Sequence, residues 1–210
     1  MRELIKMIVV LTVLSAFSGG LLAAVRVGTK DKIEQQQLNF AKAPEIKRIF
    51  DGATNDPVAD RFKMKVDGKE VNFFVAKFEG QADKIAFESF GKGFGGNIGL
   101  IIGIDTNDDK IVGVGVTTHS ETPGLGSRAK TDPSFGAQFK GLSIDDAIAV
   151  KSDGGKIDAI SGATITSKGV CLAATIGCGM YKKLKSQILE QSKAVSNGTS
   201  GGGEKEWQNQ

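Results

Sequence analysis

Residues 158–164 read Asp-Ala-Ile-Ser-Gly-Ala-Thr and end on a threonine just before a long helical pattern. The small Gly162 and Ala163 let the backbone approach a bulky anion. The following helix would supply unpaired N–H groups and the positive end of its dipole, a combination that binds phosphate. Further hydroxyl groups in this stretch belong to Ser161, Thr166 and Ser167. The pattern predicts that Thr164 presents its hydroxyl to a phosphate, although an ordinary helix N-cap fits the same residues.

A second stretch, residues 119–126, reads His-Ser-Glu-Thr-Pro-Gly-Leu-Gly and indicates a tight loop. It contains the single histidine of the chain, a residue type that can bind a metal or act as a base. Because no cysteine or second histidine lies close in sequence, we expect His119 to hydrogen-bond within its loop or to a bound group. Leu125 is expected to pack on a flat ring or in the core. Lys168 adds a positive charge that faces either a phosphate or solvent.

The two stretches together resemble the motifs of the covalent FMN-binding domain family, in which the last threonine of the first motif carries FMN through a phosphoester bond. The resemblance assigns this role to Thr164 and runs from about residue 91 to about residue 183. The flavin site that it implies also contains Ser161, Gly162, Ala163, Thr166, Ser167, His119, Glu121, Thr122, Leu125 and Gly126. With the apolar N-terminal segment, the chain is most similar to the G-subunit family of Rnf-type electron-transport complexes. The corresponding NqrC family of the sodium-pumping NADH:quinone reductase is the close alternative.

This resemblance implies a membrane-anchored flavoprotein that relays electrons within an ion-translocating ferredoxin:NAD oxidoreductase, with covalent FMN as its one cofactor. The implied partners are the other membrane subunits of that complex and, during maturation, a flavin transferase that uses FAD. A free-standing flavin reductase and a non-redox anchored assembly protein remain alternatives. The reductase is less favoured, because the glycine-rich run at residues 91–96 lacks the dinucleotide-binding spacing and leads into a strand pattern.

Residues 7–25 form an uncharged, mostly apolar run that is long enough to span a bilayer. A cleaved signal peptide is the alternative, with small residues at 18–20 or 23–24 as the cleavage site. The length of the run favours a retained anchor. Basic residues on both sides leave the orientation undecided by the positive-inside rule. The resemblance implies that the domain lies on the periplasmic or extracytoplasmic side of the cytoplasmic membrane.

The charge distribution argues against nucleic-acid binding. The formal net charge is +3, and residues 1–32 hold five basic and two acidic residues, so the rest of the chain is formally neutral. One Tyr and one Trp offer little surface for base stacking. Cys171 and Cys178 would lie about 10 Å apart along one helix, which is too far for a disulfide. We expect them to be buried thiols, since a metal centre would need more ligands than two Cys and one His supply.

The elements that must position these motifs follow from hydrophobic periodicity and turn residues. An amphipathic pattern from about residue 166 to about residue 189 predicts a helix with the threonine motif at its N-terminus. Strand patterns joined by short turns cover residues 61–66, 71–78, 85–90, 98–105 and 111–118. Short turns between consecutive strands are typical of antiparallel sheets. We therefore expect an α+β fold, an antiparallel sheet packed with helices, preceded by one transmembrane helix.

The predicted domain organisation has four parts. They are a transmembrane anchor (1–30), a helical connector (31–60), a covalent FMN-binding domain (61–191) and a disordered, Ser- and Gly-rich tail (192–210). A second Gly-Ala-Thr triplet, residues 52–54, falls in the connector. Asn-Asp-Pro follows it and no apolar helical pattern begins there, so we interpret it as a surface loop.

Overall fold

The computed structural model describes residues 1–79 and 81–196, in two compact units, Met1–Phe40 and Ala41–Gln210. The first unit is mainly helix α1 (Arg2–Gln36), which continues into a π-helical segment, Gln37–Lys42. By length and composition, the segment Arg2–Lys30 of α1 could cross a membrane. The helix is continuous through both stretches of small residues that resemble a cleavage site.

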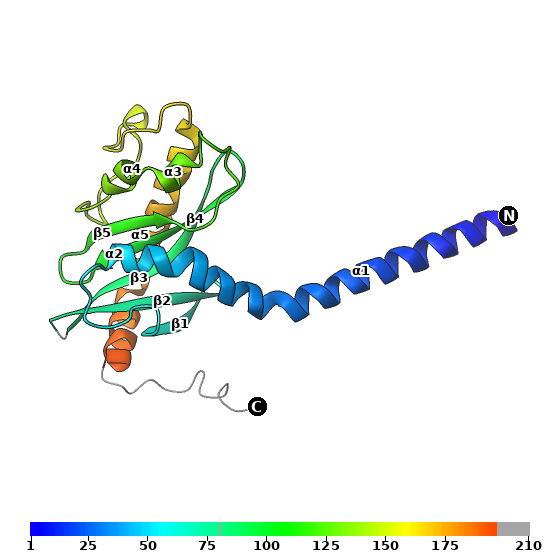
Figure 1. The fold of residues 1–210 in the computed structure, drawn as a ribbon, viewed down its shortest axis with the longest axis horizontal. Helices are drawn as coiled ribbons and strands as arrows, with labels where there is room; N and C mark the ends of the chain where they lie inside the picture. Colours follow the sequence, from blue (N-terminus) through cyan, green and yellow to red (C-terminus); the bar gives the residue numbers. More distant parts are fainter. Residues whose placement is uncertain (80, 197–210) are drawn as a thin grey trace. The chain divides into compact units, whose positions relative to one another are not determined.

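The second unit is built on a five-stranded antiparallel sheet in which each strand pairs with the next along the chain. The strands are β1 (Arg61–Val66), β2 (Lys69–Phe78), β3 (Gln81–Lys92), β4 (Asn97–Asp105) and β5 (Lys110–Val116). The turn between β1 and β2 has positive φ angles at Asp67 (49°) and Gly68 (79°), as a two-residue hairpin requires. All five predicted strands are confirmed, and with them the α+β fold (Figure 1).

Helix α5 (Thr164–Ser196) covers one face of this sheet (Figure 1). It approaches β3 so closely that a Cβ atom on Gly91 would lie 2.0 Å from the Gly169 carbonyl oxygen. Cys171 and Cys178 are buried on this helix as free thiols, and desolvation raises the pKa of each to about 11.

The C-terminal end of α5 differs from the sequence prediction, because the helix continues to Ser196. The prediction of a disordered tail from residue 192 is therefore wrong for residues 192–196. Ser192 is fully buried and donates a hydrogen bond to the Leu189 carbonyl oxygen. The remainder of the predicted tail lies outside the described residues.

Helix α2 (Ala43–Ile49) packs on the opposite face of the sheet. Its Ile46 and the following Phe50 are buried, and Ile49 lies over Gly103 of β4, where a Cβ atom would be 2.5 Å from its side chain. The predicted connector 31–60 is therefore not one separate element. Its later part, from residue 41, belongs to the folded unit, because this packing buries the apolar face of α2.

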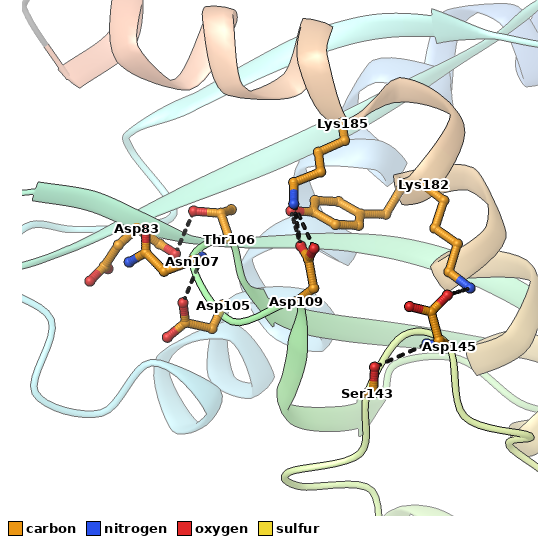
Figure 2. Close-up of polar contacts among 10 residues, drawn as sticks. Asp83, Asp105, Thr106, Asn107, Asp109, Ser143, Asp145, Lys182 and Lys185 are labelled. Carbon is orange, nitrogen blue, oxygen red and sulfur yellow. Dashed lines mark hydrogen bonds and ion pairs between the residues drawn. The ribbon is translucent and has the colours of Figure 1, made fainter.

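Charged side chains fix the later turns of α5 to the β4–β5 turn (Figure 2). The Asp109 carboxylate accepts hydrogen bonds from Lys185 Nζ at 2.6 and 2.7 Å and from the Tyr181 hydroxyl at 3.2 Å. Burial raises the pKa of Tyr181 above its usual value. Because Tyr181 is 17 residues beyond Thr164, about 25 Å of helix separates this anchor from the helix N-terminus.

Candidate functional site

The N-terminus of α5 begins with a tight turn. Gly162 has φ 79°, a left-handed conformation that favours glycine, and a Cβ atom there would lie 3.3 Å from the Leu125 side chain. Thr164 is the first residue of the helix and is exposed. Its hydroxyl makes no hydrogen bond to any described residue. The turn therefore presents an uncommitted hydroxyl next to the free N–H groups of the first helical turn.

The neighbouring hydroxyl groups are used within the protein. Ser167 is buried, donates to the Ala163 carbonyl oxygen at 3.0 Å and accepts from the Ile160 N–H at 3.0 Å. Thr166 is also buried and donates to Glu121 Oε2 at 2.5 Å. From the sequence pattern we expect both hydroxyls beside a phosphate. In the structure they instead make hydrogen bonds within the protein that stabilise the start of α5.

The loop 119–126 is held beside this helix entry by Glu121, which is 6% exposed. Its Oε1 accepts a hydrogen bond from the backbone N–H of Gly95 at 2.9 Å. The approach requires glycine, because a Cβ atom at residue 95 would lie 2.0 Å from the Ser120 carbonyl oxygen. His119 is half-buried, and its Nδ1 accepts the N–H of Glu121 at 3.3 Å. The histidine therefore bonds within its own loop.

A pocket of about 430 Å³ lies between this loop and the start of α5. Of the predicted site residues it is lined by Glu121, Thr122, Leu125, Gly126, Gly162, Ala163, Thr164 and Thr166. Ser161, Ser167 and His119 do not line it. Two lining residues, Phe94 and Ile165, were not predicted from the sequence. The one signal for Phe94 is a large aromatic residue in a run of glycines.

The lining has the chemistry of a site for a flat ring that bears a phosphate. Phe94, Leu125 and Ile165 are 75%, 48% and 51% exposed and offer apolar contact surface. Thr164 stands beside them at the positive end of a 33-residue helix. The pocket volume lies within the range of roughly 300–1,000 Å³ that is usual for cofactor sites. These residues therefore fit a phosphorylated aromatic cofactor.

Lys168, one turn after Thr164, is engaged elsewhere. Its Nζ lies 2.8 Å from Asp153 Oδ1, and the hydrogen bond from Lys168 is the main cause that lowers the pKa of the Asp153 carboxyl group. Its charge still lies near the helix N-terminus. The structure thus assigns Lys168 a protein partner, with no direct contact to Thr164 among the described interactions.

Comparison with known proteins identifies the domain. Residues 93–176 match the FMN-binding domain family. The chain is 33% identical to the G subunit of the ion-translocating oxidoreductase complex of Methanosarcina acetivorans, over 80% of this chain and 89% of the relative. It is 36% identical to the G subunit of the proton-translocating ferredoxin:NAD(+) oxidoreductase complex of Clostridium ljungdahlii, over 76% and 82%.

Solved structures with a similar fold are more distant in sequence. The C subunit of the Na(+)-translocating NADH-quinone reductase of Parabacteroides distasonis is 26% identical, with a TM-score of 0.55 over 72% of this chain and 95% of that structure. Shewanella oneidensis NqrC is also 26% identical, with a TM-score of 0.50 over 66% and 72%. This chain therefore shares its sheet with packed helices with these two C subunits.

Proposed function

Because the chain belongs to the G-subunit family of ion-translocating oxidoreductase complexes and contains an FMN-binding domain, we propose that it carries FMN covalently on Thr164 and relays electrons within such a complex. One observation carries the choice of residue. Among the four hydroxyl groups at positions 161–167, only that of Thr164 both lines the pocket and is free of hydrogen bonds to described residues.

The attachment needs a free hydroxyl and a place for the phosphate. The Thr164 oxygen would lose its proton and bond to the phosphorus of the FMN half of FAD, with release of AMP by a separate flavin transferase. The N–H groups at the start of α5 would then hold the phosphate. Phe94, Leu125 and Ile165 would contact the ring and exclude water from part of it. Bound FMN supplies one- and two-electron transfer between redox partners.

The partners follow from the relatives. Proteins that are 32–36% identical to this chain are named as subunits of ion-translocating oxidoreductase complexes. We infer that this chain assembles with the other membrane subunits of such a complex and needs a flavin transferase for maturation. A free-standing flavin reductase would have to bind its own nicotinamide electron donor. No nicotinamide-binding pattern is visible in the sequence, so this alternative is less favoured.

The attachment residue is tested by intact mass spectrometry after co-expression with the transferase. Wild type should be heavier than the polypeptide by one FMN less one water. Thr164→Ala should lack this mass and lose about 0.5 kcal/mol of stability or less, because the residue is exposed and its hydroxyl makes no hydrogen bond to a described residue. Thr164→Ser keeps a hydroxyl and should be labelled at least partly.

Two matched variants separate Thr164 from its neighbours. Thr166→Ala and Ser161→Ala each remove another hydroxyl of the motif. If Thr164→Ala keeps the extra mass and one of these variants loses it, the chosen hydroxyl is wrong. If wild type never carries the mass with an active transferase present, covalent attachment itself is disproved.

We further propose that α1 is a retained membrane anchor and that the FMN-binding domain faces the extracytoplasmic side. The apolar segment Arg2–Lys30 and the relatives' membership of ion-translocating complexes support the anchor. N-terminal sequencing of membrane-extracted protein should begin at or near Met1, and a start near Leu21 or Val25 would show cleavage. A protease added outside the cytoplasmic membrane should digest the domain, and protection would reverse this orientation.

A further inference from the structure

We propose that Glu121 is the positioning residue of the pocket and that its buried negative charge makes the bound flavin harder to reduce. The second half of this inference depends on the proposed function. Glu121 combines two properties. Its carboxylate joins three segments of chain that form the pocket, and it does so with neutral hydrogen-bond donors only.

The positioning role follows because the three segments that Glu121 joins, the first turn of α5, the β3–β4 turn and the loop 119–126, each contribute a residue to the pocket lining. Thr166 lies on the first turn of α5, two residues after Thr164. Gly95 lies in the β3–β4 turn and is adjacent to Phe94, which also lines the pocket. Glu121 itself belongs to the loop that contributes Leu125. A single carboxylate therefore sets the spacing between the attachment residue and the side chains that would contact the ring.

The packing around the carboxylate leaves little freedom. A Cβ atom on Gly93 would lie 2.4 Å from Oε1, and one on Gly126 would lie 2.7 Å from both Oε2 and Thr166 Oγ1. Glycine at these two positions is what admits the side chain. Such close enclosure keeps both hydrogen bonds in place while the outer rim of the pocket stays exposed.

The electrostatic role follows from the lack of a compensating cation. Within residues 1–79 and 81–196, no ion pair to Glu121 is formed. The nearby Lys168 pairs with Asp153, and Arg128 pairs with Asp132. Reduction adds negative charge to a flavin, and a buried anion in the pocket wall repels it more strongly than a solvated one would. The carboxylate should therefore shift the midpoint potential to a more negative value.

Glu88 provides a matched control within the same domain. It is also largely buried, with a 12% exposed side chain, and also accepts a 2.5 Å hydrogen bond from a threonine, Thr117. Its second oxygen pairs with Lys42 Nζ at 2.8 Å, so its charge is compensated. Glu88 alternates along β3 with Phe87 and Ser89, which face α5, and therefore lies on the other face of the sheet.

The first experiment compares midpoint potentials of the full-length, flavin-loaded protein. Glu121→Gln can keep the geometry, because its amide oxygen can accept from Gly95 and its NH₂ can donate to the Thr166 oxygen. It should retain the covalent FMN mass and shift the potential to a more positive value. Glu88→Gln should leave the potential unchanged. An unshifted Glu121→Gln, or equal shifts in both variants, would disprove the electrostatic role.

The second experiment uses the full-length protein expressed without the transferase, and so is independent of the flavin. Glu121→Ala and Thr166→Val should each lower the unfolding temperature. The double variant should unfold at nearly the temperature of the less stable single variant, because both remove the same hydrogen bond. Additive losses would disprove the positioning role. If wild type carries no covalent FMN, the proposed function fails, but this test still decides whether Glu121 positions the loop.

Discussion

The chain contains two Gly-Ala-Thr triplets, at residues 52–54 and 162–164, and the structure gives them different surroundings. Their glycines have almost the same φ angle, 83° at Gly52 and 79° at Gly162. Their threonines differ. The Thr54 hydroxyl donates to the Lys77 carbonyl oxygen at 3.0 Å, whereas the Thr164 hydroxyl has no partner among the described residues. The triplet alone therefore does not define an attachment site.

The residues after each triplet account for the difference. After Thr54 the chain turns, and Pro57 disfavours helix at the preceding residue. After Thr164 a helix of 33 residues begins, and the loop 119–126 packs beside its first turn. The helix supplies N–H groups for a phosphate, and the loop supplies the pocket. The attachment that we propose for Thr164 thus relies on tertiary structure that Thr54 lacks.

The largest contrast is expected from Gly162→Ala and Gly52→Ala. Both place a side chain at a positive φ, which costs roughly 1–2 kcal/mol. Only the new methyl group at residue 162 would also press on Leu125, 3.3 Å away. We expect Gly162→Ala to lose most of its covalent FMN by intact mass, whereas Gly52→Ala keeps all of it. Equal loading would show that the turn at Gly162 does not shape the pocket.

The elements that the sequence predicted best are those with strong local patterns. Alternation and turn residues located all five strands, and small residues before an amphipathic run located the start of α5. The packing of α2 was not predicted, because it depends on glycines such as Gly103 that leave room on the far face of the sheet. The end of α5 was missed because the serine- and glycine-rich composition after residue 191 carries no helical pattern, whereas Ser192 is buried in the folded unit.

The candidate site was predictable in its motifs but not in its connections. The hydrogen bond from Thr166 to Glu121 joins residues 45 positions apart, and no local pattern encodes such a contact. Phe94 and Ile165 are exposed apolar residues, which are common on protein surfaces, so an aromatic residue in a glycine run was too weak a signal to assign Phe94 to the site. Resemblance to a family named the cofactor, whereas the structure identified which hydroxyl groups the protein itself uses.

Different side chains fix each triplet in place. Ser167 bonds to Ile160 and Ala163, next to one triplet. Next to the other, the Asn55 side chain accepts from Lys77 N and donates to the Val75 carbonyl oxygen. Ser167→Ala and Asn55→Ala should each lose about 1–3 kcal/mol in denaturant unfolding, because each removes two hydrogen bonds between a side chain and the backbone.

Only one of these two losses of stability should also lower the amount of covalent FMN. Ser167→Ala frees the turn before Thr164, so a reduced fraction of covalent FMN is expected by intact mass. Asn55→Ala should retain the wild-type fraction at a similar loss of stability. If both variants lose FMN equally, stability alone controls loading, and the local role of Ser167 is disproved.

The smallest effect is expected from Thr54→Ala. The side-chain hydrogen bond that it removes is exposed, and the backbone N–H of Thr54 still donates to the Lys77 carbonyl oxygen at 2.9 Å, so the loop keeps its attachment to β2. The loss of stability should be about 0.5 kcal/mol or less, as for most surface substitutions. The covalent FMN mass should remain complete, because no helix begins at this threonine to hold a phosphate. A lower FMN content in Thr54→Ala, with unfolding unchanged, would mean that the transferase recognises the triplet 52–54 as well. The surroundings of Thr164 would then not be what restricts flavin attachment to the second triplet.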